Sequence, residues 1–380
     1  MIRAHRIRLN PTPEQAVYFR KAAGTARFVF NWGLAAWKAH KAAHPGEAHG
    51  ALALKKDFNA LKGEQFPWVY DVAKDVAEGA FTNLAAALKN HYNSQAGKRA
   101  GRKVGFPRFK TKKNARQSFR LNNDKLDVAD HALYVPKLGW VNMAEALRLD
   151  GKIMGAVVSK TSSHWYVSIT VEMEAPPPQA FERPVVGIDL GLKTLMVLSD
   201  GTQRENQTLL RSELTHLKRL SRRLSRRQMG SRRWYRAKDR LANFQARIAN
   251  RRADYLHKTT TEIAGAYAVV GLEDLNVAGM LRNRHLALSL SDAAFGEIRR
   301  QLEYKCAARG GQLVVVSRFF PSSRRCSVCG ERYAELKLAD REWVCPTCGA
   351  LNQRDANAAR NIELEVVRLL SETPGVASSG

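Results

Sequence analysis

Two pairs of cysteines constrain the fold of this chain more than any other feature. Cys326 and Cys329 form one pair and Cys345 and Cys348 the other, and a glycine follows each pair. The two-residue spacing lets both sulfurs of a tight turn face one ion, and the glycine permits the positive φ that such a turn needs. The segment is too small to bury a core of its own, so we predict a structural Zn²⁺ held by all four sulfurs.

A redox role for these cysteines is the alternative. Two C-x-x-C units separated by fifteen residues are typical of a zinc ribbon, which favours the metal. The fifth cysteine, Cys306, stands alone in a predicted helix, where we expect an inert buried thiol.

The charge balance indicates the class of partner. The chain of 380 residues carries 62 Lys and Arg against 35 Asp and Glu, a formal net charge of +27. Such an excess repels itself in a compact protein, and a polyanion offsets it. A ribosome-associated or merely basic protein is the alternative to a protein that acts on nucleic acid.

The first basic segment covers residues 98–120, which hold ten Lys and Arg and no acid. Phe106, Phe109 and Phe119 alternate with these bases, as a solvated linker rarely does. We therefore predict phosphate contacts together with local packing. The candidate contacts are Arg102, Lys103, Arg108 and Lys110.

A second basic segment runs from Lys218 to Arg252, with fourteen Lys and Arg and one acid, Asp239. A solvated helix face would carry mixed signs four residues apart, whereas here like charges repel at that spacing. A groove for a polyanion is the favoured interpretation. Its candidate contacts are Arg222, Arg223, Arg226 and Arg227.

Three acids lie where catalysis could use them. Asp189 and Glu273 end two apolar predicted strands, and Asp355 opens a helix just after the second cysteine pair. An acid at the end of a buried strand is costly unless it is paired or bound to metal. If the strands are neighbours, the carboxylates converge and suit Mg²⁺ or Mn²⁺ in phosphodiester hydrolysis. For Asp355 a simple helix cap is the alternative.

Predicted elements give the first half its organisation. A strand over residues 2–9 precedes a mainly helical region that a capping box at Thr12 and Gln15 opens and that extends to about residue 96. Aromatic residues at helical spacing there, Tyr92 among them, are predicted to be core. Strands over 125–128, 132–135, 147–149, 153–159 and 165–172 predict a small antiparallel barrel or sandwich. The proline run at 176–178 marks a domain boundary.

The second half alternates strands and helices. We predict strands over 185–190, 195–198, 267–272 and 312–317, and two basic helices between 209 and 249 that break near Gly230. A further helix is predicted to be capped near Ser291 and Asp292, and the last one starts at Asp355. The tail from Ser371 is predicted to be disordered.

Several motifs resemble those of one family. They include Val-Gly-Ile-Asp189-Leu-Gly, Gly-Leu-Glu273-Asp-Leu-Asn, Leu288–Asp292, Phe320–Cys326 and Arg354–Ile362, with segments 26–31 and 103–109 upstream. At these residues the chain resembles the TnpB family, RNA-guided DNA endonucleases that insertion sequences encode and that are related to compact type V CRISPR effectors.

The resemblance implies a multidomain α/β fold and a function. It implies a RuvC-type, RNase H-like nuclease domain (181–317 and 351–370) interrupted by a zinc ribbon (318–350), a helical recognition lobe (11–96), a wedge-like β-barrel (1–10 and 97–180) and a tail (371–380). Asp189, Glu273 and Asp355 would be its catalytic residues. The implied partners are a guide RNA and a double-stranded DNA target that carries a short flanking motif, and we expect a monomer with one RNA.

Two alternatives to a guided nuclease remain at this point. One is a DNA transposase that uses the same carboxylates to join transposon ends, and the other is a non-catalytic RNA-guided regulator. A histidine-pair site with a nucleophilic tyrosine is excluded, because no two of the ten histidines are two residues apart. No helix-turn-helix is evident that would read DNA directly, which favours a guide. No signal or membrane segment is evident, so we expect the prokaryotic cytosol or nucleoid.

Overall fold

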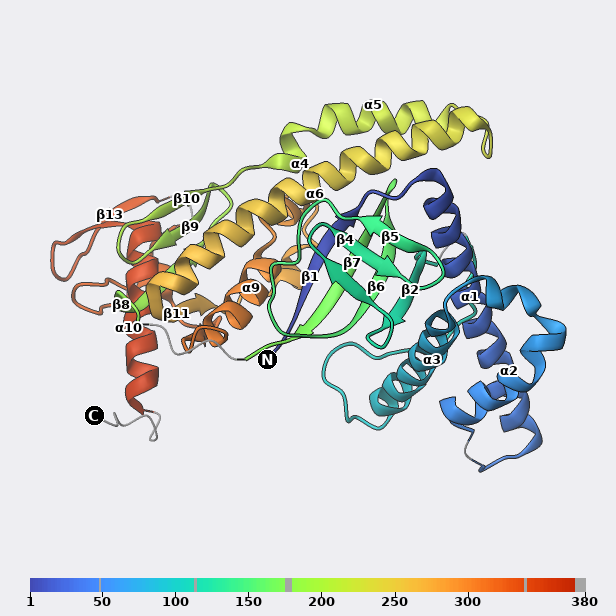
Figure 1. Ribbon diagram of the computed structural model, residues 1–380. Coiled ribbons are helices and arrows are strands. Elements are labelled where there is room, and N and C mark those ends of the chain that lie inside the picture. Colours follow the sequence, from blue (N-terminus) through green and yellow to red (C-terminus); the bar gives the residue numbers. More distant parts are fainter. Residues whose placement is uncertain (48, 113–114, 175–179, 338–339, 373–380) are drawn as a thin grey trace. The chain divides into compact units, whose positions relative to one another are not determined.

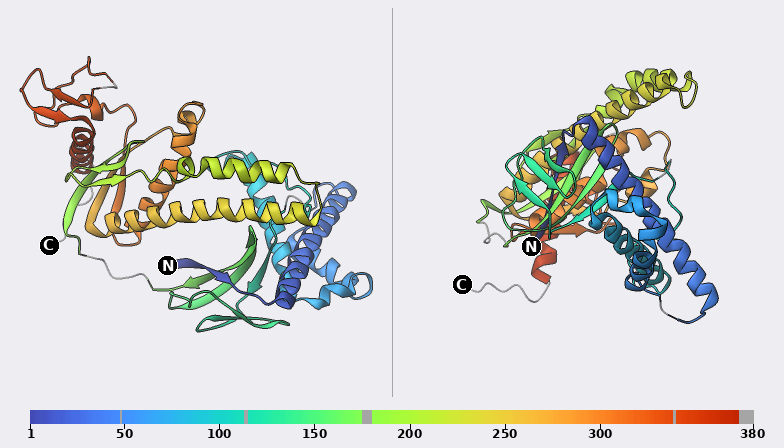
Figure 2. Two further views of the ribbon diagram at one scale, coloured as in Figure 1. Left: turned by 90° about the horizontal axis from the view of Figure 1, so that it is seen from above. Right: turned by 45° about the vertical axis from the view of Figure 1, so that its right-hand side comes forward.

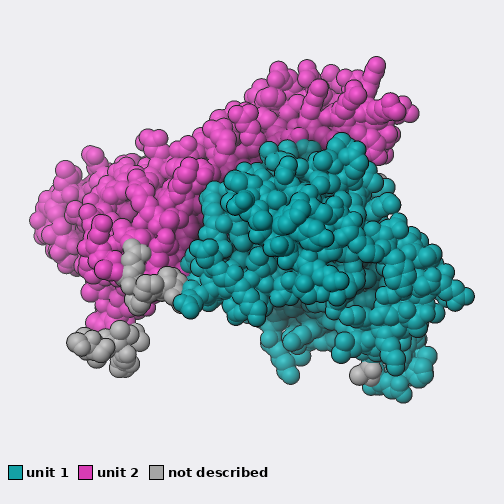
Figure 3. Space-filling model, in the orientation of Figure 1, with its two compact units in different colours: residues 1–174 teal, residues 175–380 magenta. Residues whose placement is uncertain are grey.

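The computed structural model describes residues 1–47, 49–112, 115–174, 180–337 and 340–372. The chain forms two compact units, residues 1–174 and 175–380 (Figure 3). The proline run that we predict as a boundary lies outside the described residues. In the described residues, no helix is both long and apolar enough to cross a membrane.

Unit 1 combines three long helices with two small sheets. Its elements are β1 (Ile2–Leu9), α1 (Pro13–Ala43), α2 (Ala51–Gln65), the 3-10 helix η1 (Pro67–Asp71), α3 (Lys74–Gln95), β2 (Ser118–Asn122), β3 (Asp127–Ala129), β4 (Ala132–Val135), β5 (Gly139–Asn142), β6 (Lys152–Thr161) and β7 (His164–Glu172). The predicted capping box opens α1: the Thr12 side chain accepts from the Gln15 backbone, and the Gln15 side chain accepts from the Thr12 backbone.

The four-stranded sheet of unit 1 has the order β1-β7-β6-β2, and β3, β4 and β5 form a separate antiparallel sheet. The larger sheet packs against α1, where the Phe19 ring lies 5.8 Å from Phe119 and 5.1 Å from Trp165. A second core joins the three helices, with Phe58 and Phe81 buried between them. These apolar contacts make one body of the helices and the sheet.

Some predictions for unit 1 are wrong. No strand forms at 147–149, because Leu147 and Leu149 pack against the core without pairing. The strands β2 and β5 were not predicted. Tyr92, predicted as core, is 50% exposed because it lies in the last turn of α3, although its ring is 6.5 Å from the ring of Trp37.

Unit 2 contains a five-stranded sheet with helices on both faces. Its elements are β8 (Arg183–Leu190), β9 (Thr194–Leu198), β10 (Gln203–Glu205), α4 (Leu209–Ser212), α5 (Leu214–Ser225), α6 (Arg232–Ala266), β11 (Tyr267–Glu273), α7 (Val277–Met280), α8 (Ala287–Ala293), α9 (Phe295–Ala307), β12 (Gln312–Val316), the 3-10 helix η2 (Ser322–Arg324), β13 (Glu342–Val344), β14 (Leu351–Gln353) and α10 (Arg354–Glu372).

The sheet has the order β10-β9-β8-β11-β12. The strands β8, β11 and β12 are parallel, whereas β9 and β10 run antiparallel to their neighbours. Val186, Ile188, Val270 and Leu272 point to one face, into the core that α6 and α9 cover. The opposite face packs against α10, which lies beside β8 in Figure 1.

Two glycines allow α10 to approach the sheet closely. Gly187 of β8 and Gly271 of β11 are paired across the two strands. A Cβ on Gly187 would collide with the backbone of Ala359 and Glu363, and one on Gly271 would lie 2.6 Å from Val366 Cγ2. The backbone of α10 therefore occupies the space of a side chain at Gly187, and side chains of α10 occupy it at Gly271.

The helices of unit 2 differ from the predictions in three places. The break near Gly230 is confirmed, with a φ of +86°, but α6 continues to Ala266 instead of ending near 249. Asp292 lies inside α8 and does not cap the following helix; its carboxylate accepts from the backbone of Leu210 and Arg211, at the start of α4. Ser371 and Glu372, predicted as disordered, belong to α10, and the rest of the tail lies outside the described residues.

The close approach of α10 gives a stability prediction. Gly187→Ala should destabilise unit 2 by about 1–3 kcal/mol, because backbone atoms cannot move aside as a flexible side chain can. Urea unfolding measures this change. Gly296→Ala in α9 is the matched control: its Cβ meets nothing within 4 Å, so the substitution should be neutral or slightly stabilising. Equal stabilities of the two variants would contradict the close packing.

Candidate functional site

The structure brings the three predicted carboxylates to one edge of the five-stranded sheet. Side chains alternate along a strand, so Asp189 and Glu273, two residues after Gly187 and Gly271, face α10 as the glycines do. Residues four apart share a helix face, so Asp355 lies on the side of α10 that Ala359 turns toward Gly187. The parallel pairing of Leu272 with Ile188 puts the two strand carboxylates at the same level.

The pKa values of two of these acids are shifted by burial and by the charges of neighbouring acids. Burial, with the charges of Asp355 and Glu273, raises the pKa of Asp189 to about 7. Burial and the adjacent Asp274 also raise the pKa of Glu273. A site that disfavours its own negative charges is one that a cation would stabilise.

Arginines surround the carboxylates without cancelling them. The charges of Arg354 and Arg341 act on Asp189 in the direction that lowers its pKa. Arg341 Nη1 lies 3.3 Å from Asp355 Oδ1. The neighbouring Asp274 is paired with two arginines, because Arg299 and Arg318 both donate to it.

The carboxylate oxygens are more widely spaced than the ligands of a bound ion. Within the described residues, two groups have ligand atoms that all lie within 4.8 Å of one another: the four cysteines, and His40 with His44 and Glu47. The three carboxylates are not such a group. Their wider spacing follows from their mutual repulsion and from the attraction of Asp355 to Arg341.

The cysteine cluster has the geometry of a tetrahedral site. Cys326 Sγ lies 3.7 Å from Cys348 Sγ, and Cys329 Sγ lies 3.6 Å from Cys345 Sγ. A tetrahedral ion with Zn–S bonds of about 2.3 Å holds its sulfurs about 3.8 Å apart, so the four thiols fit Zn²⁺. The predicted positive φ is confirmed at both glycines, +78° at Gly330 and +72° at Gly349.

Two asparagines join the cysteine segment to α10, and their role was not predicted. The Asn357 side chain accepts from Ser327 N at 2.8 Å and donates to Arg325 O at 2.7 Å. Asn361 donates to Ser322 O at 2.7 Å and to the same Arg325 carbonyl. Both are buried polar residues on a helix that also carries Asp355. The motif contains both residues, but its sequence alone does not show what they bind.

The first basic segment divides into exposed and packed residues. Arg102, Lys103 and Arg108 are exposed. Lys110 is half-buried, its ammonium lies 3.6 Å from the centre of the Phe30 ring, and burial lowers its pKa. Because the fold already holds this ammonium, we omit Lys110 from the proposed phosphate contacts.

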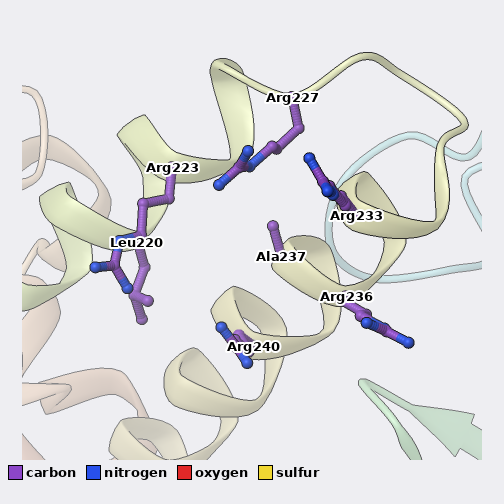
Figure 4. A pocket seen from close by; sticks show the side chains of 7 residues that line it. All are labelled: Leu220, Arg223, Arg227, Arg233, Arg236, Ala237 and Arg240. Carbon is purple, nitrogen blue, oxygen red and sulfur yellow. The ribbon is translucent and has the colours of Figure 1, made fainter.

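The second basic segment forms a hairpin of α5 and α6, visible as two adjacent helices in Figure 2. Five arginines line a cavity of about 360 Å³ in it, and Arg227 and Arg233 extend into the space between the two helical segments (Figure 4). The five are Arg223, Arg227, Arg233, Arg236 and Arg240. None of the five has an ion-pair partner among the described residues. Arg222 and Arg226, also predicted as phosphate contacts, lie outside the cavity.

Comparison with solved structures defines the class of fold. The chain is similar to the protein in a Cas12f1–sgRNA–target DNA complex, with a TM-score of 0.56 at 14% identity over 93% of this chain and 83% of that one. It is also similar to the mini-RNA-guided endonuclease CRISPR-Cas_phi3, with a TM-score of 0.51 at 9% identity over 100% of this chain and 93% of that one. The chain therefore has the mixed α/β, multidomain fold of these proteins.

Sequence comparison then gives the family. Residues 168–284 match a family described as "Probable transposase", and residues 295–362 match the "Cas12f1-like, TNB domain". "Putative RNA-guided DNA endonuclease InsQ" of Escherichia coli is 32% identical over 95% of this chain and 91% of the relative. A Streptomyces pristinaespiralis protein with the description "Putative RNA-guided DNA endonuclease" is 33% identical over 95% and 88%. The chain belongs to the TnpB family, which confirms the resemblance.

One match differs from the structure in its description. Residues 1–44 match a family described as a "Helix-turn-helix domain". In the structure this segment is the strand β1 followed by one continuous helix, α1, with no turn between Pro13 and Ala43.

The cysteine cluster gives a metal prediction. The purified protein should carry one zinc ion that resists dialysis, and Cys329→Ser should remove it and unfold the segment around it. Elemental analysis and proteolysis measure these changes. Cys306→Ala is the control, because this thiol is buried in α9 outside the cluster and burial raises its pKa to about 11. Zinc well below one per chain in the wild type would contradict the assignment.

The electrostatics of Asp189 give a pH prediction. Its folded pKa of about 7 exceeds the ordinary value of 3.8, so ionisation costs stability as pH rises above the lower value, with the full cost above the higher. In magnesium-free buffer, Asp189→Asn should therefore stabilise the protein by about 1–3 kcal/mol at pH 8, after allowance for partial exposure, and by less at pH 5.

Urea unfolding at both pH values tests this expectation. Asp254→Asn is the matched control: this exposed carboxylate accepts from Lys258, so its substitution should not stabilise the protein. A gain from Asp189→Asn that is the same at both pH values would show that charge burial is not its cause.

Proposed function

We propose that this protein is an RNA-guided DNA endonuclease with a RuvC-type site in which Asp189, Glu273 and Asp355 are the catalytic carboxylates. One observation carries the proposal: the close contact of α10 with Gly187 and Gly271 brings three distant acids to one sheet edge. The relatives' names support guided DNA cleavage. The strand order β10-β9-β8-β11-β12, in which β9 alone runs antiparallel to the other strands, supports an RNase H-like core.

The donor set fits a hard divalent cation. The three side chains offer carboxylate oxygens, and the pKa values of Asp189 and Glu273 are raised by burial and by the neighbouring acids. These carboxylates would hold Mg²⁺ or Mn²⁺, which when bound supplies an activated water and stabilises the leaving oxygen of a phosphodiester. The role of α10 is to keep Asp355 in register with the strand carboxylates, and Arg341 keeps a positive charge beside them.

The zinc ribbon has a structural role in the proposal. All four thiols of Cys326, Cys329, Cys345 and Cys348 would be ligands, which leaves no position for a reacting water. The hydrogen bonds of Asn357 and Asn361 with the ribbon would hold α10, the helix that carries Asp355, in a fixed position against it.

The basic segments support a nucleic-acid partner of large phosphate surface. Five arginines around one cavity repel one another and have no acidic partner among the described residues, so a polyanion stabilises them. Base pairing by a guide supplies the sequence specificity that backbone contacts lack, and the protein reads only a short flanking motif. We propose a monomer that holds one guide RNA and a double-stranded DNA target.

The arginine cavity generates a paired prediction. Arg223→Gln with Arg227→Gln should weaken nucleic-acid binding and flatten its salt dependence by about two phosphate contacts, because both side chains line the cavity. Arg222→Gln with Arg226→Gln removes the same charge outside the cavity and should cost less. Binding titrations over a range of salt concentrations compare the pairs. If the two double substitutions weaken binding equally, the cavity is not a specific contact and the whole hairpin acts as one basic surface.

The guide generates the central test. The protein is expressed with and without its neighbouring genomic DNA, the bound RNA is recovered and sequenced, and the variable end of that RNA is exchanged. Cleavage in Mg²⁺ should move to the DNA that matches the new end and should be absent without RNA. Asp189→Ala, Glu273→Ala and Asp355→Ala should each abolish cleavage while target binding survives, whereas the exposed Asp254→Ala should cut normally.

Three outcomes would contradict parts of this proposal. Cutting that ignores the exchanged RNA would leave an unguided nuclease. Joined DNA products would favour a transposase, which the description "Probable transposase" of the matched family makes worth testing. Guided binding with no cleavage by the wild type would favour a regulator.

A further inference from the structure

Two histidines and a glutamate gather where α1 ends, in unit 1. His40 lies in the last turn of α1, His44 caps that helix, and Glu47 follows in the connection to α2. Residues four apart on a helix share one face, which is the spacing by which two histidines chelate one ion. The ligand atoms of the three side chains all lie within 4.8 Å of one another.

The distances are close to those of a coordination sphere. His40 Nε2 lies 3.8 Å from Glu47 Oε2. A tetrahedral ion with bonds of about 2.0–2.1 Å to nitrogen and oxygen holds its ligands about 3.4 Å apart. Small rotations of these side chains, two of them exposed at the surface, bring the three donors to that separation.

A second feature indicates that the group is organised. The His49 ring stacks on His40, with centroids 4.0 Å apart and an interplanar angle of 16°. His49 Nε2 is in turn 2.9 Å from Asp57 Oδ2 of α2. His40 Nδ1 is buried and has no hydrogen-bond partner among the described residues, and a buried polar atom in that condition is costly. Stacking and burial thus fix the orientation of the His40 ring, and its other nitrogen, Nε2, faces Glu47.

We propose that His40, His44 and Glu47 form a second metal site, which binds a divalent transition cation such as Zn²⁺. Imidazoles with one carboxylate favour Zn²⁺, Co²⁺ or Ni²⁺ over Mg²⁺ and Ca²⁺, which prefer oxygen ligands. The site differs in donors from the cysteine cluster and from the carboxylate group. A bound ion would fasten the end of α1 to its connection, and His49 with Asp57 would extend that link to α2.

The experiment is a calorimetric titration of Zn²⁺ into full-length protein that retains its ribbon zinc. The wild type should bind one further equivalent, and Ni²⁺ should bind in competition. His44→Ala, at an exposed position, should weaken this binding by at least about tenfold. His131→Ala, another exposed histidine of unit 1 outside the cluster, is the matched control and should bind as the wild type does.

Further variants separate this site from the ribbon and from misfolding. His40→Gln tests the half-buried ligand, with circular dichroism as the check on α1. Cys329→Ser should lose the ribbon zinc and still bind the further equivalent of Zn²⁺ at His40, His44 and Glu47. Added Zn²⁺ should raise the melting temperature of the wild type and of His131→Ala but not that of His44→Ala.

The proposal is overturned if the wild type takes up no further equivalent, or if His44→Ala and His40→Gln take it up with unchanged affinity. Neither result depends on whether the protein cleaves DNA.

Discussion

The close contact between α10 and the sheet is the constraint on which the rest of unit 2 depends. Gly187 and Gly271 are paired neighbours without side chains, so backbone atoms of α10 at Gly187 and side chains of α10 at Gly271 lie where a Cβ would be. This contact fixes how far along the sheet α10 can slide, and therefore where Asp355 stands relative to Asp189. The same helix is bound to the cysteine segment through Asn357 and Asn361. One packing contact thus sets the geometry of two chemically different centres.

The candidate site shows how the fold keeps unfavourable charge in place. Three acids at one edge repel one another, and burial of Asp189 adds to the cost. The acids cannot separate because strand pairing and helix packing fix the positions of their backbones. A cluster of positive charges occurs in the hairpin of α5 and α6, which holds five arginines around one cavity. Apolar cores on both faces of the sheet stabilise the arrangement of the acids.

Local rules predicted the features that depend on a few neighbouring residues. The capping box at Thr12, the break near Gly230 and the cysteine turns with positive φ all follow from side chains within four residues. Features set by distant partners were missed. Leu147 and Leu149 alternate like a strand, yet nothing pairs with them, and Asp292 caps a helix 82 residues away in sequence instead of its own. Likewise, the sequence showed a run of arginines but not which of them share a cavity. The catalytic role of the three acids remains a prediction.

The contact of Gly187 with Ala359 joins residues near the two ends of unit 2. During synthesis on the ribosome, β8 and β11 emerge with two of the acids well before α10 supplies the third. Because the helix also closes over the exposed face of the sheet, the growing chain has neither a complete set of carboxylates nor a finished core until its last described element has formed. Assembly of the fold and completion of the site are therefore the same event. An unfinished copy would lack one of the three acids that we propose as catalytic.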